Sequence, residues 1–190
     1  MKKIAALVLL ILLGINSFSQ SSIKCVIKTS LGDIFMELYP KKAPITVSNF
    51  MKYVDNDLFK NSSFFRTCTP ENEADRDIKI EVIQGGDISE EKLLGSIPIE
   101  TTDQTKILHK HGTISMARSE PNTAQSNFFI CINDQPELDF KGKRNPDGQG
   151  FAAFGKVTKG MDVVLQIQSQ KNEGQMMPNP IAIYSIQRIK

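Results

Sequence analysis

Residues 112–134 read GTISMARSEPNTAQSNFFICIND. The apolar runs near the two ends of this segment, at 113–116 and 128–132, predict short strands, whereas the small and amide residues between them fit neither an amphipathic helix nor a strand. Successive side chains of a strand point to opposite faces, so the adjacent Phe128 and Phe129 must lie on different sides of the sheet. We expect one of them in the core and the other in a binding site.

Short apolar runs of the same kind recur along the rest of the chain. Residues 23–38 alternate apolar and polar side chains around a turn at 30–33, which predicts a β-hairpin with one buried face. Further runs lie at 64–65, 80–83, 151–157 and 181–189. Regularly spaced short strands are typical of a β-barrel or a β-sandwich.

Two segments have the periodicity of helices. The apolar side chains of 47–54 follow the spacing of an amphipathic helix, and we expect Thr46 to cap its first turn. A second helix is predicted to begin near Gly160. Two such helices could close the two open ends of a barrel. The polar segments 67–79 and 141–149 are interpreted as solvated loops.

The first nineteen residues have the pattern of a secretory signal peptide. Lys2 and Lys3 precede an apolar run at 4–13, and small residues follow at 17–19. The alternative is a membrane anchor, but the run is about half of the roughly 20 residues that cross a bilayer. We therefore predict cleavage near Ser19, export to the periplasm or the medium, and a single mature domain at 20–190.

The charge of the mature chain argues against two classes of partner. The full sequence has 23 basic and 21 acidic residues, and removal of Lys2 and Lys3 leaves 21 of each. A formally neutral chain without a basic cluster lacks the electrostatic surface that nucleic acid or an anionic membrane requires. We expect neither partner after cleavage, and we expect a monomer.

The cysteines and histidines do not form a metal-binding pattern. The chain has three cysteines, so one disulfide and one free thiol remain possible, although Cys25 and Cys131 lie in apolar runs where buried thiols are common. Their spacing matches no zinc or redox motif. His109 and His111 have no third ligand nearby, which favours an ordinary surface or turn role. We expect neither a metal nor another cofactor.

Four motifs together resemble the cyclophilin family of peptidyl-prolyl isomerases. They are FFR at 64–66, QGGD at 84–87, MARSEPNTAQSNFFI at 116–130 and FGKV at 154–157. Their order also matches, and the resemblance runs through the whole mature chain. It implies a mainly β fold, a closed antiparallel β-barrel of eight strands capped by two α-helices.

The resemblance also implies a site for proline-containing polypeptides. It puts Arg66 beside a pocket for the proline ring, and it gives Gln84 the role of supporting the arginine and the substrate. Six further residues are carried over as substrate-binding: Phe129, Leu138 and Phe151 in the pocket lining, Ala117 and Arg118 through their backbone groups, and Asn127 in place of the family's usual glutamine.

These residue types suit the rotation of a peptide bond before proline. The barrier is about 18–20 kcal/mol because amide resonance must be broken. In the twisted state the proline nitrogen loses its conjugation and becomes an acceptor, so a rigid charged donor such as Arg66 can stabilise that state selectively. An apolar slot for the ring supplies orientation, and neither an acid nor a nucleophile is required.

One departure from the family keeps an alternative open. The segment between Arg66 and Gln84 is longer than usual, and Glu81 falls where the family has a phenylalanine of the proline pocket. Either the carboxylate disturbs the pocket, or the longer segment shifts the register and brings Ile78 or Ile80 into the gap. The first case favours a proline-peptide binding module or chaperone, and the second favours an isomerase that assists the folding of exported proteins.

A third hypothesis is a hydrolase that uses Ser115 or Ser126 with His109 or His111. It is the least favoured, because the chain has no nucleophile-elbow motif and no acid with an assigned place.

Overall fold

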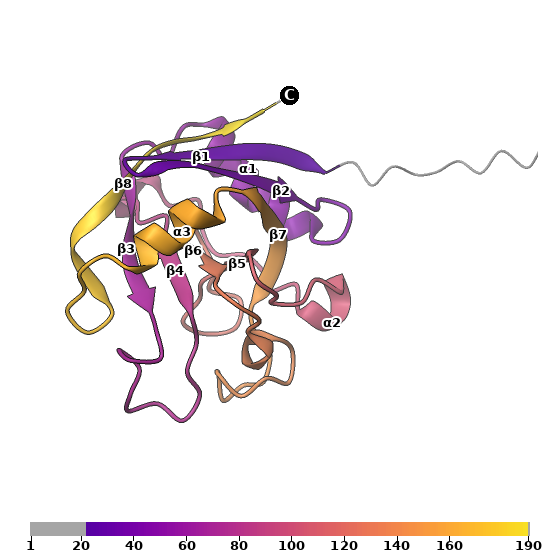
Figure 1. Cartoon of the computed structure of the whole chain (residues 1–190). Helices are drawn as coiled ribbons and strands as arrows, with labels where there is room; N and C mark the ends of the chain where they lie inside the picture. The colour runs from indigo at the N-terminus through magenta and orange to yellow at the C-terminus, as the bar shows by residue number, and fades with distance from the viewer. Residues whose placement is uncertain (1–21, 190) are drawn as a thin grey trace, which may run out of the picture.

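The computed structural model describes residues 22–189, and the predicted signal peptide at 1–19 lies outside them. Eight strands form one closed barrel in the order β1-β2-β7-β5-β6-β4-β3-β8, with β8 paired to β1 (Figure 1). They are β1 (Ile23–Thr29), β2 (Gly32–Leu38), β3 (Ser62–Cys68), β4 (Val82–Gly85), β5 (Thr113–Met116), β6 (Phe128–Cys131), β7 (Ala152–Lys159) and β8 (Met176–Arg188). Each pair is antiparallel, so the predicted barrel is confirmed.

The first hairpin shows how the alternation in the sequence becomes the barrel wall. β1 and β2 pair Cys25 with Met36 and Ile27 with Ile34, and all four side chains are buried. They belong to the main apolar core, because one face of each strand points into the barrel.

Aromatic rings fill the interior of the barrel. They come from α1, from the turn that follows it and from β3, β6 and β7, and they are Phe50, Phe59, Phe64, Phe128 and Phe154. Ring centroids within this group lie 5.1–5.8 Å apart, a range in which aromatic pairs attract. The interior is therefore a packed core, and a binding site must be sought outside the wall.

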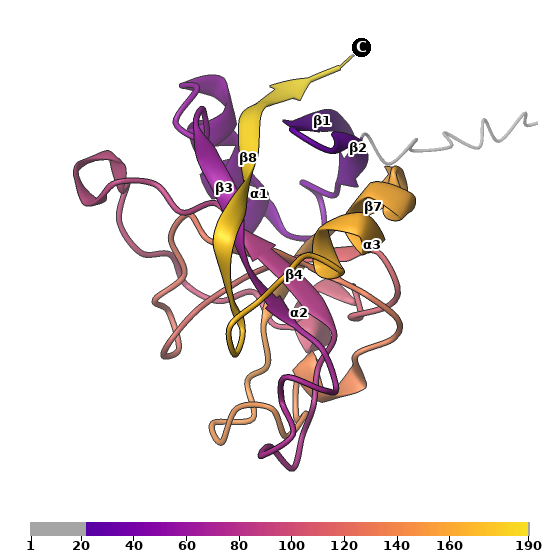
Figure 2. The same ribbon diagram turned by 60° about the vertical axis from the view of Figure 1, so that its left-hand side comes forward.

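Helices α1 (Pro44–Asp55) and α3 (Met161–Gln168) are the two that the sequence predicts. Both bury apolar side chains in the main core. In Figure 1, α3 lies on the near side of the barrel and α1 lies behind it. The two helices also lie apart in the turned view of Figure 2. The structure adds the one-turn helix α2 (Thr102–Thr105) and the 3-10 helices η1 (Glu90–Lys92) and η2 (Pro136–Leu138). No helix within residues 22–189 has the length and apolar character needed to span a membrane.

The start of α1 differs from the prediction. Thr46 lies inside the helix and Ala43 occupies the N-cap position. The helix is capped instead by the carboxylate of Glu100, which accepts hydrogen bonds from the backbone N–H groups of Ile45 (3.1 Å) and Thr46 (2.7 Å). A negative charge at this end also interacts favourably with the helix dipole.

All three cysteines are buried as free thiols, which answers the question of a disulfide. Burial raises the pKa of Cys25 and of Cys68 to about 11 and that of Cys131 well above its ordinary value. Because the thiolate is the reactive form, these thiols are structural rather than reactive.

Candidate functional site

A second apolar cluster lies on the outer face of the barrel wall. In β6, Phe128 and Ile130 belong to the main core, whereas Phe129 and Cys131 belong to this outer cluster. The same alternation in β4 sends Ile83 inward and Val82 outward. The prediction that the two adjacent phenylalanines separate is confirmed, with Phe128 in the core and Phe129 outside it.

The outer cluster forms the floor of a cavity of about 430 Å³. The structure brings all eight of the predicted site residues to its lining: Arg66, Gln84, Ala117, Arg118, Asn127, Phe129, Leu138 and Phe151. They come from β3, β4, β6, η2 and the loops beside them, so a closed barrel is needed to assemble them.

Two aromatic rings form an apolar corner in this cavity. The rings of Phe129 and Phe151 meet edge to face, with centroids 5.4 Å apart and an interplanar angle of 89°. Leu138 is fully buried beside them in the same cluster. The guanidinium of Arg118 lies over the Phe151 ring, 5.2 Å from its centroid.

Arg66 is held at the cavity by amide side chains. Its Nη1 donates to Oε1 of Gln84 (2.7 Å), and its Nε (3.0 Å) and Nη2 (2.5 Å) donate to Oε1 of Gln175. Nε2 of Gln84 in turn donates to Oδ1 of Asn127 (3.4 Å), which continues the chain of amides. Arg66 forms no salt bridge with another residue in the described range 22–189.

Gln175 is a site residue that sequence reasoning missed. It follows Arg66 by more than 100 residues in a polar turn before β8, and no motif distinguishes it. Its backbone carbonyl accepts the N–H of Thr67 (2.9 Å), so the turn is fixed next to Arg66.

At 117–118, the backbone N–H of Ala117 and the guanidinium of Arg118 form hydrogen bonds within the protein. The N–H of Ala117 donates to the carbonyl of Asn127 (2.9 Å), so this N–H already has a partner inside the protein. The guanidinium of Arg118 makes two 2.8 Å hydrogen bonds to the carboxylate of Asp147 and one of 2.9 Å to the carbonyl of Gly150.

Ile80, and not Glu81, reaches the cavity. Ile80 is buried in the outer cluster next to Val82 and lines the cavity. The carboxylate of Glu81 turns away and accepts a hydrogen bond from Nδ2 of Asn133 (3.2 Å), while its backbone carbonyl accepts the N–H of Ile132 (2.8 Å). Of the two alternatives that the sequence leaves open, the register shift that supplies Ile80 is therefore the one that occurs.

The interpretation of 67–79 and 141–149 as solvated loops is wrong at two positions. The side chain of Glu73 is 0% exposed, that of Arg144 is 7% exposed, and the two form a salt bridge with paired hydrogen bonds. Glu73 also accepts the N–H of Ile80 (2.8 Å). A charge is buried in such a loop only when a partner compensates it, and here each loop supplies the partner of the other.

The two glycines of QGGD allow this part of the wall to pack closely. A Cβ atom on Gly85 would lie 2.8 Å from the Phe64 ring, and one on Gly86, whose φ is +87°, would lie 2.8 Å from the carbonyl of Ser126. Both are therefore positions at which the backbone closely approaches its neighbours.

Comparison with known proteins identifies the family. The sequence profile described as cyclophilin type peptidyl-prolyl cis-trans isomerase/CLD matches residues 24–188. The chain belongs to this family of cyclophilins. A peptidyl-prolyl cis-trans isomerase of Acinetobacter baylyi is 33% identical over 98% of this chain and 95% of its own length. Peptidyl-prolyl cis-trans isomerase A of Dickeya dadantii is 34% identical over 100% of this chain and 98% of its own.

Solved structures show the same fold. A cyclophilin type peptidyl-prolyl cis-trans isomerase of Cryptosporidium parvum superposes with a TM-score of 0.72 at 22% identity, covering 90% of this chain and 99% of its own. The crystal structure of that protein in the presence of the dipeptide Ala-Pro gives a TM-score of 0.70 at 22% identity, over 88% and 99% of the two chains. This chain is thus a cyclophilin-type isomerase in both sequence and fold.

His109 packs against the aromatic corner of this cyclophilin, and of the surface or turn role that the sequence favours, the surface position is wrong. The side chain is buried, Nδ1 lies 2.7 Å from Oδ1 of Asp139, and Nε2 lies 2.9 Å from Oγ of Ser115. The imidazole is nearly parallel to the Phe129 ring, with centroids 5.9 Å apart. Ser115 is fully buried, so a substrate cannot reach it and the hydrolase hypothesis has no accessible nucleophile there.

The buried imidazole predicts a pH-dependent stability. Burial lowers the pKa of His109 below its ordinary value of 6.5, although Asp139 acts in the opposite direction. Between the two values the unfolded chain binds a proton that the folded chain excludes, so stability falls as the pH falls below about 6.5, by up to about 1.4 kcal/mol per pH unit. Urea unfolding of the wild type and of His109→Gln between about pH 7.5 and about pH 5.5 measures this dependence. Parallel pH profiles for the two proteins would contradict it.

The geometry of the cavity wall predicts that substitutions at two adjacent residues differ in their effect on peptide binding. Ile80→Asn puts a polar side chain in the apolar wall that would contact the proline ring and should weaken binding of an Ala-Pro peptide about tenfold, which corresponds to about 1.4 kcal/mol. Glu81→Ala should leave the dissociation constant unchanged, since its carboxylate points to Asn133. NMR titration of both variants measures the affinities, and a larger loss in Glu81→Ala than in Ile80→Asn refutes the assignment.

Proposed function

We propose that this isomerase acts on X-Pro bonds of exported polypeptides at the cavity described above, with Arg66 as its catalytic residue. The observation that carries the proposal is the position of Arg66, which lines the same cavity as the apolar corner and whose side-chain hydrogen bonds within residues 22–189 go only to amide oxygens. The proline ring would enter the corner formed by Phe129, Phe151 and Ile80.

The hydrogen bonds of Arg66 leave donors for a substrate. A guanidinium has five N–H groups, and the contacts to Gln84 and Gln175 use three of them. Two N–H groups, one on each Nη, remain to meet the proline nitrogen when the amide twists and its lone pair becomes available. Because a planar, conjugated ground state offers no such acceptor, the interaction stabilises the transition state selectively.

The neutral partners of Arg66 also matter for catalysis. A carboxylate in the place of either glutamine would hold the guanidinium in an ion pair and reduce the charge that a substrate experiences. Amide oxygens orient the side chain without cancelling its charge. Gln84 and Gln175 would therefore preorganise Arg66 and keep it available.

The remaining predicted residues would bind and orient the peptide. Phe129, Phe151 and Leu138 would contact the proline ring, while the backbone at 117–118 and the amide of Asn127 would contact the chain on either side of it. A fixed ring and a fixed chain leave the X-Pro bond as the axis about which the substrate turns. The Ala-Pro dipeptide present with the Cryptosporidium parvum protein supports a small X-Pro unit as a ligand of this type of cavity.

The alternative of a binding module without activity rested on a carboxylate in the pocket wall. Ile80 occupies that wall and Glu81 lies outside it, so the observation that favoured the alternative is removed. The enzyme is the function that the geometry supports best.

The proposal extends to the setting in which the protein acts. The pattern at 1–19 supports export, so the substrates would be proline-containing polypeptides of the periplasm or the medium whose folding is slowed by X-Pro isomerisation. The exported protein would act as a monomer, without a cofactor and without attachment to a membrane or to nucleic acid.

Replacement of Arg66 tests the catalytic assignment. Arg66→Ala should lower kcat/KM for an Ala-Pro peptide by about 100-fold, which is the usual effect of removing one preorganised donor. Arg66→Lys should also be impaired, because an ammonium cannot hold both glutamines and the substrate with the geometry of the guanidinium. NMR exchange spectroscopy of the peptide measures the rates.

Arg188→Ala is the matched control for this experiment. Arg188 lies in β8 and pairs with Asp55 at the surface, away from the cavity lining. Its loss should leave the exchange rate unchanged. Equal rates for Arg66→Ala and the wild type would exclude Arg66 as the catalytic residue, and a folded wild type without acceleration would return the binding module as the better proposal.

Processing of the N-terminus tests export. When the full chain is expressed in a bacterium with two membranes, the periplasmic fraction should contain a protein whose N-terminus lies near residue 20, since the small residues at 17–19 fit a signal-peptidase site. Leu10→Asp should block processing by interrupting the apolar run. Mass spectrometry of the periplasmic and cytosolic fractions measures the cleavage. An intact chain that stays in the cytosol argues against export.

A further inference from the structure

One buried carboxylate connects the two halves of the site. Oε1 of Glu73 accepts a hydrogen bond from Nε2 of Gln175 (2.8 Å), whose Oε1 in turn accepts those of Arg66. Oε2 of Glu73 accepts the backbone N–H of Ile80 (2.8 Å). The same side chain therefore lies behind the candidate catalytic cation and behind the apolar wall.

We propose that Glu73 is a positioning residue for Arg66 and acts through the side-chain amide of Gln175. This inference rests on the proposed role of Arg66 in isomerisation. It gives the segment 67–79 a function that its sequence does not suggest, because the loop holds the catalytic residue in place.

The argument begins with the two ends of the Gln175 amide. A carboxylate can only accept hydrogen bonds, and a guanidinium can only donate them. An amide placed between Glu73 and Arg66 can satisfy both only with its NH2 group toward Glu73 and its oxygen toward Arg66, and this is the arrangement present. Glu73 and Arg66 thus fix the amide from its two ends, and Glu73 holds the NH2 group so that the oxygen stays presented to Arg66.

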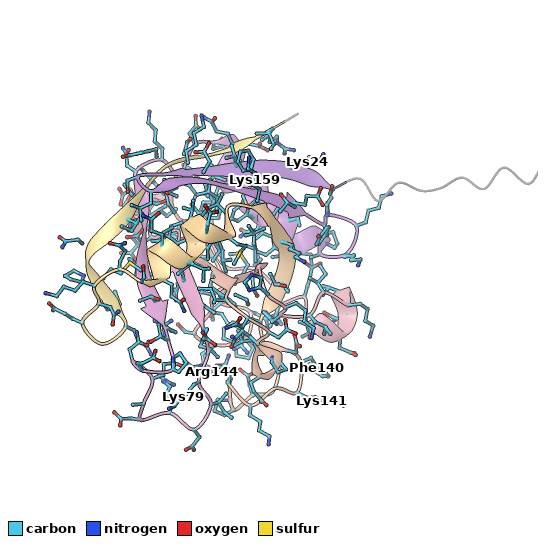
Figure 3. All side chains as sticks on the ribbon, viewed as in Figure 1. Lys24, Lys79, Phe140, Lys141, Arg144 and Lys159 are labelled. Atoms are coloured by element: carbon cyan, nitrogen blue, oxygen red, sulfur yellow. The ribbon has the colours of Figure 1, made fainter. Side chains whose placement is uncertain are left out.

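The charge of Glu73 is stable in its buried position. Burial by itself would raise the pKa of this carboxyl, but the hydrogen bonds from Arg144 and from the N–H of Ile80 outweigh it and keep the pKa below its ordinary value of 4.5. Arg144 also donates to the carbonyl of Ile78, which ties the cation to the loop. Figure 3 shows Arg144 close to the part of this loop that carries Lys79.

The Gln175 amide lies between Glu73 and Arg66, so the carboxylate does not contact the guanidinium of Arg66 directly. Glu73 is neutralised by Arg144 in a two-point contact, and only its orienting effect passes to Arg66 through the amide. A direct ion pair with Arg66 would hold that side chain equally well but would weaken its interaction with a twisted amide. The intermediate glutamine supplies the orientation and avoids this loss.

Two variants interrupt this series of hydrogen bonds at different points. Glu73→Gln keeps the shape of the side chain but no longer dictates the orientation of the Gln175 amide, because its own amide both donates and accepts. Gln175→Met removes the link and leaves the contacts of Glu73 with Arg144 and Ile80 in place. Glu71→Gln is the matched control: it makes the same chemical change in the same loop at an exposed position.

Two readouts are measured for each variant. The first is the 1H–15N NMR signal of the Arg66 Nε–H group, identified by its absence in Arg66→Lys, which reports the position of the guanidinium whether or not the protein is active. The second is exchange spectroscopy of an Ala-Pro peptide. We expect Glu73→Gln and Gln175→Met to shift the Arg66 signal and to lower kcat by about tenfold or more, with KM changed by less than about twofold. Glu71→Gln should resemble the wild type in both.

A combined variant tests whether Glu73 acts through Gln175. Glu73→Gln with Gln175→Met should match Gln175→Met alone in kcat and in the Arg66 signal, because the link is already absent. Multiplied losses, or an unchanged Arg66 signal in folded Glu73→Gln, overturn the proposal. If Glu73→Gln does not fold, Glu73→Gln with Arg144→Met repeats the test without leaving a buried cation unpaired.

The two readouts separate failure of this inference from failure of the proposed function. If the wild type does not accelerate exchange, the proposed function fails and the Arg66 signal alone decides the inference. If the wild type is active and Arg66→Ala is not, but both interrupted variants retain the kcat and the Arg66 signal of the wild type, the function stands and the positioning role of Glu73 is refuted.

Discussion

The wall of the barrel is one strand thick, and the rest of the structure depends on this constraint. Phe129 and Gln84 face the cavity, and their chain neighbours Phe128 and Ile83 are fixed in the core. Tight packing of the aromatic interior therefore also fixes the backbone of the site. A shift of one residue in β4 or β6 would exchange the two faces and lose the core and the site together.

The distribution of charge around the cavity depends on which arginines form a salt bridge with a carboxylate. Arg118 is held by Asp147 and Arg144 by Glu73, each through two hydrogen bonds. Arg66 receives amide oxygens in their place. The first two cations therefore serve structure, and in the proposed function the third keeps its charge for the substrate. This division of roles cannot be inferred from the number of arginines, because it depends on the partner of each one.

The sequence predicts the parts of this cyclophilin that depend on neighbouring residues in the chain, such as strand alternation and short motifs. Strand alternation and the family motifs together predicted the barrel, the two longer helices and the residues that line the cavity. The failures concern side chains whose partners lie far away in the chain: Glu73 and Arg144 are separated by 71 residues, His109 and Asp139 by 30, and Thr46 and Glu100 by 54. A polar residue in a loop looks solvated until the fold brings it a partner, and no periodic pattern encodes that event.

The segment 67–79 shows how an insertion can be kept next to a site that requires precise geometry. Lengthening a loop costs little chain entropy, but it leaves the strand that follows without a defined register. The hydrogen bond from the Ile80 N–H to Glu73 supplies that register from within the loop, and the salt bridge to Arg144 compensates the buried charge that the bond requires. The register in turn puts an aliphatic side chain in the wall and leaves Phe129 and Phe151 as the aromatic surfaces of the cavity. The carboxylate that makes the insertion compatible with the fold is thus the same group that the amide of Gln175 connects to Arg66.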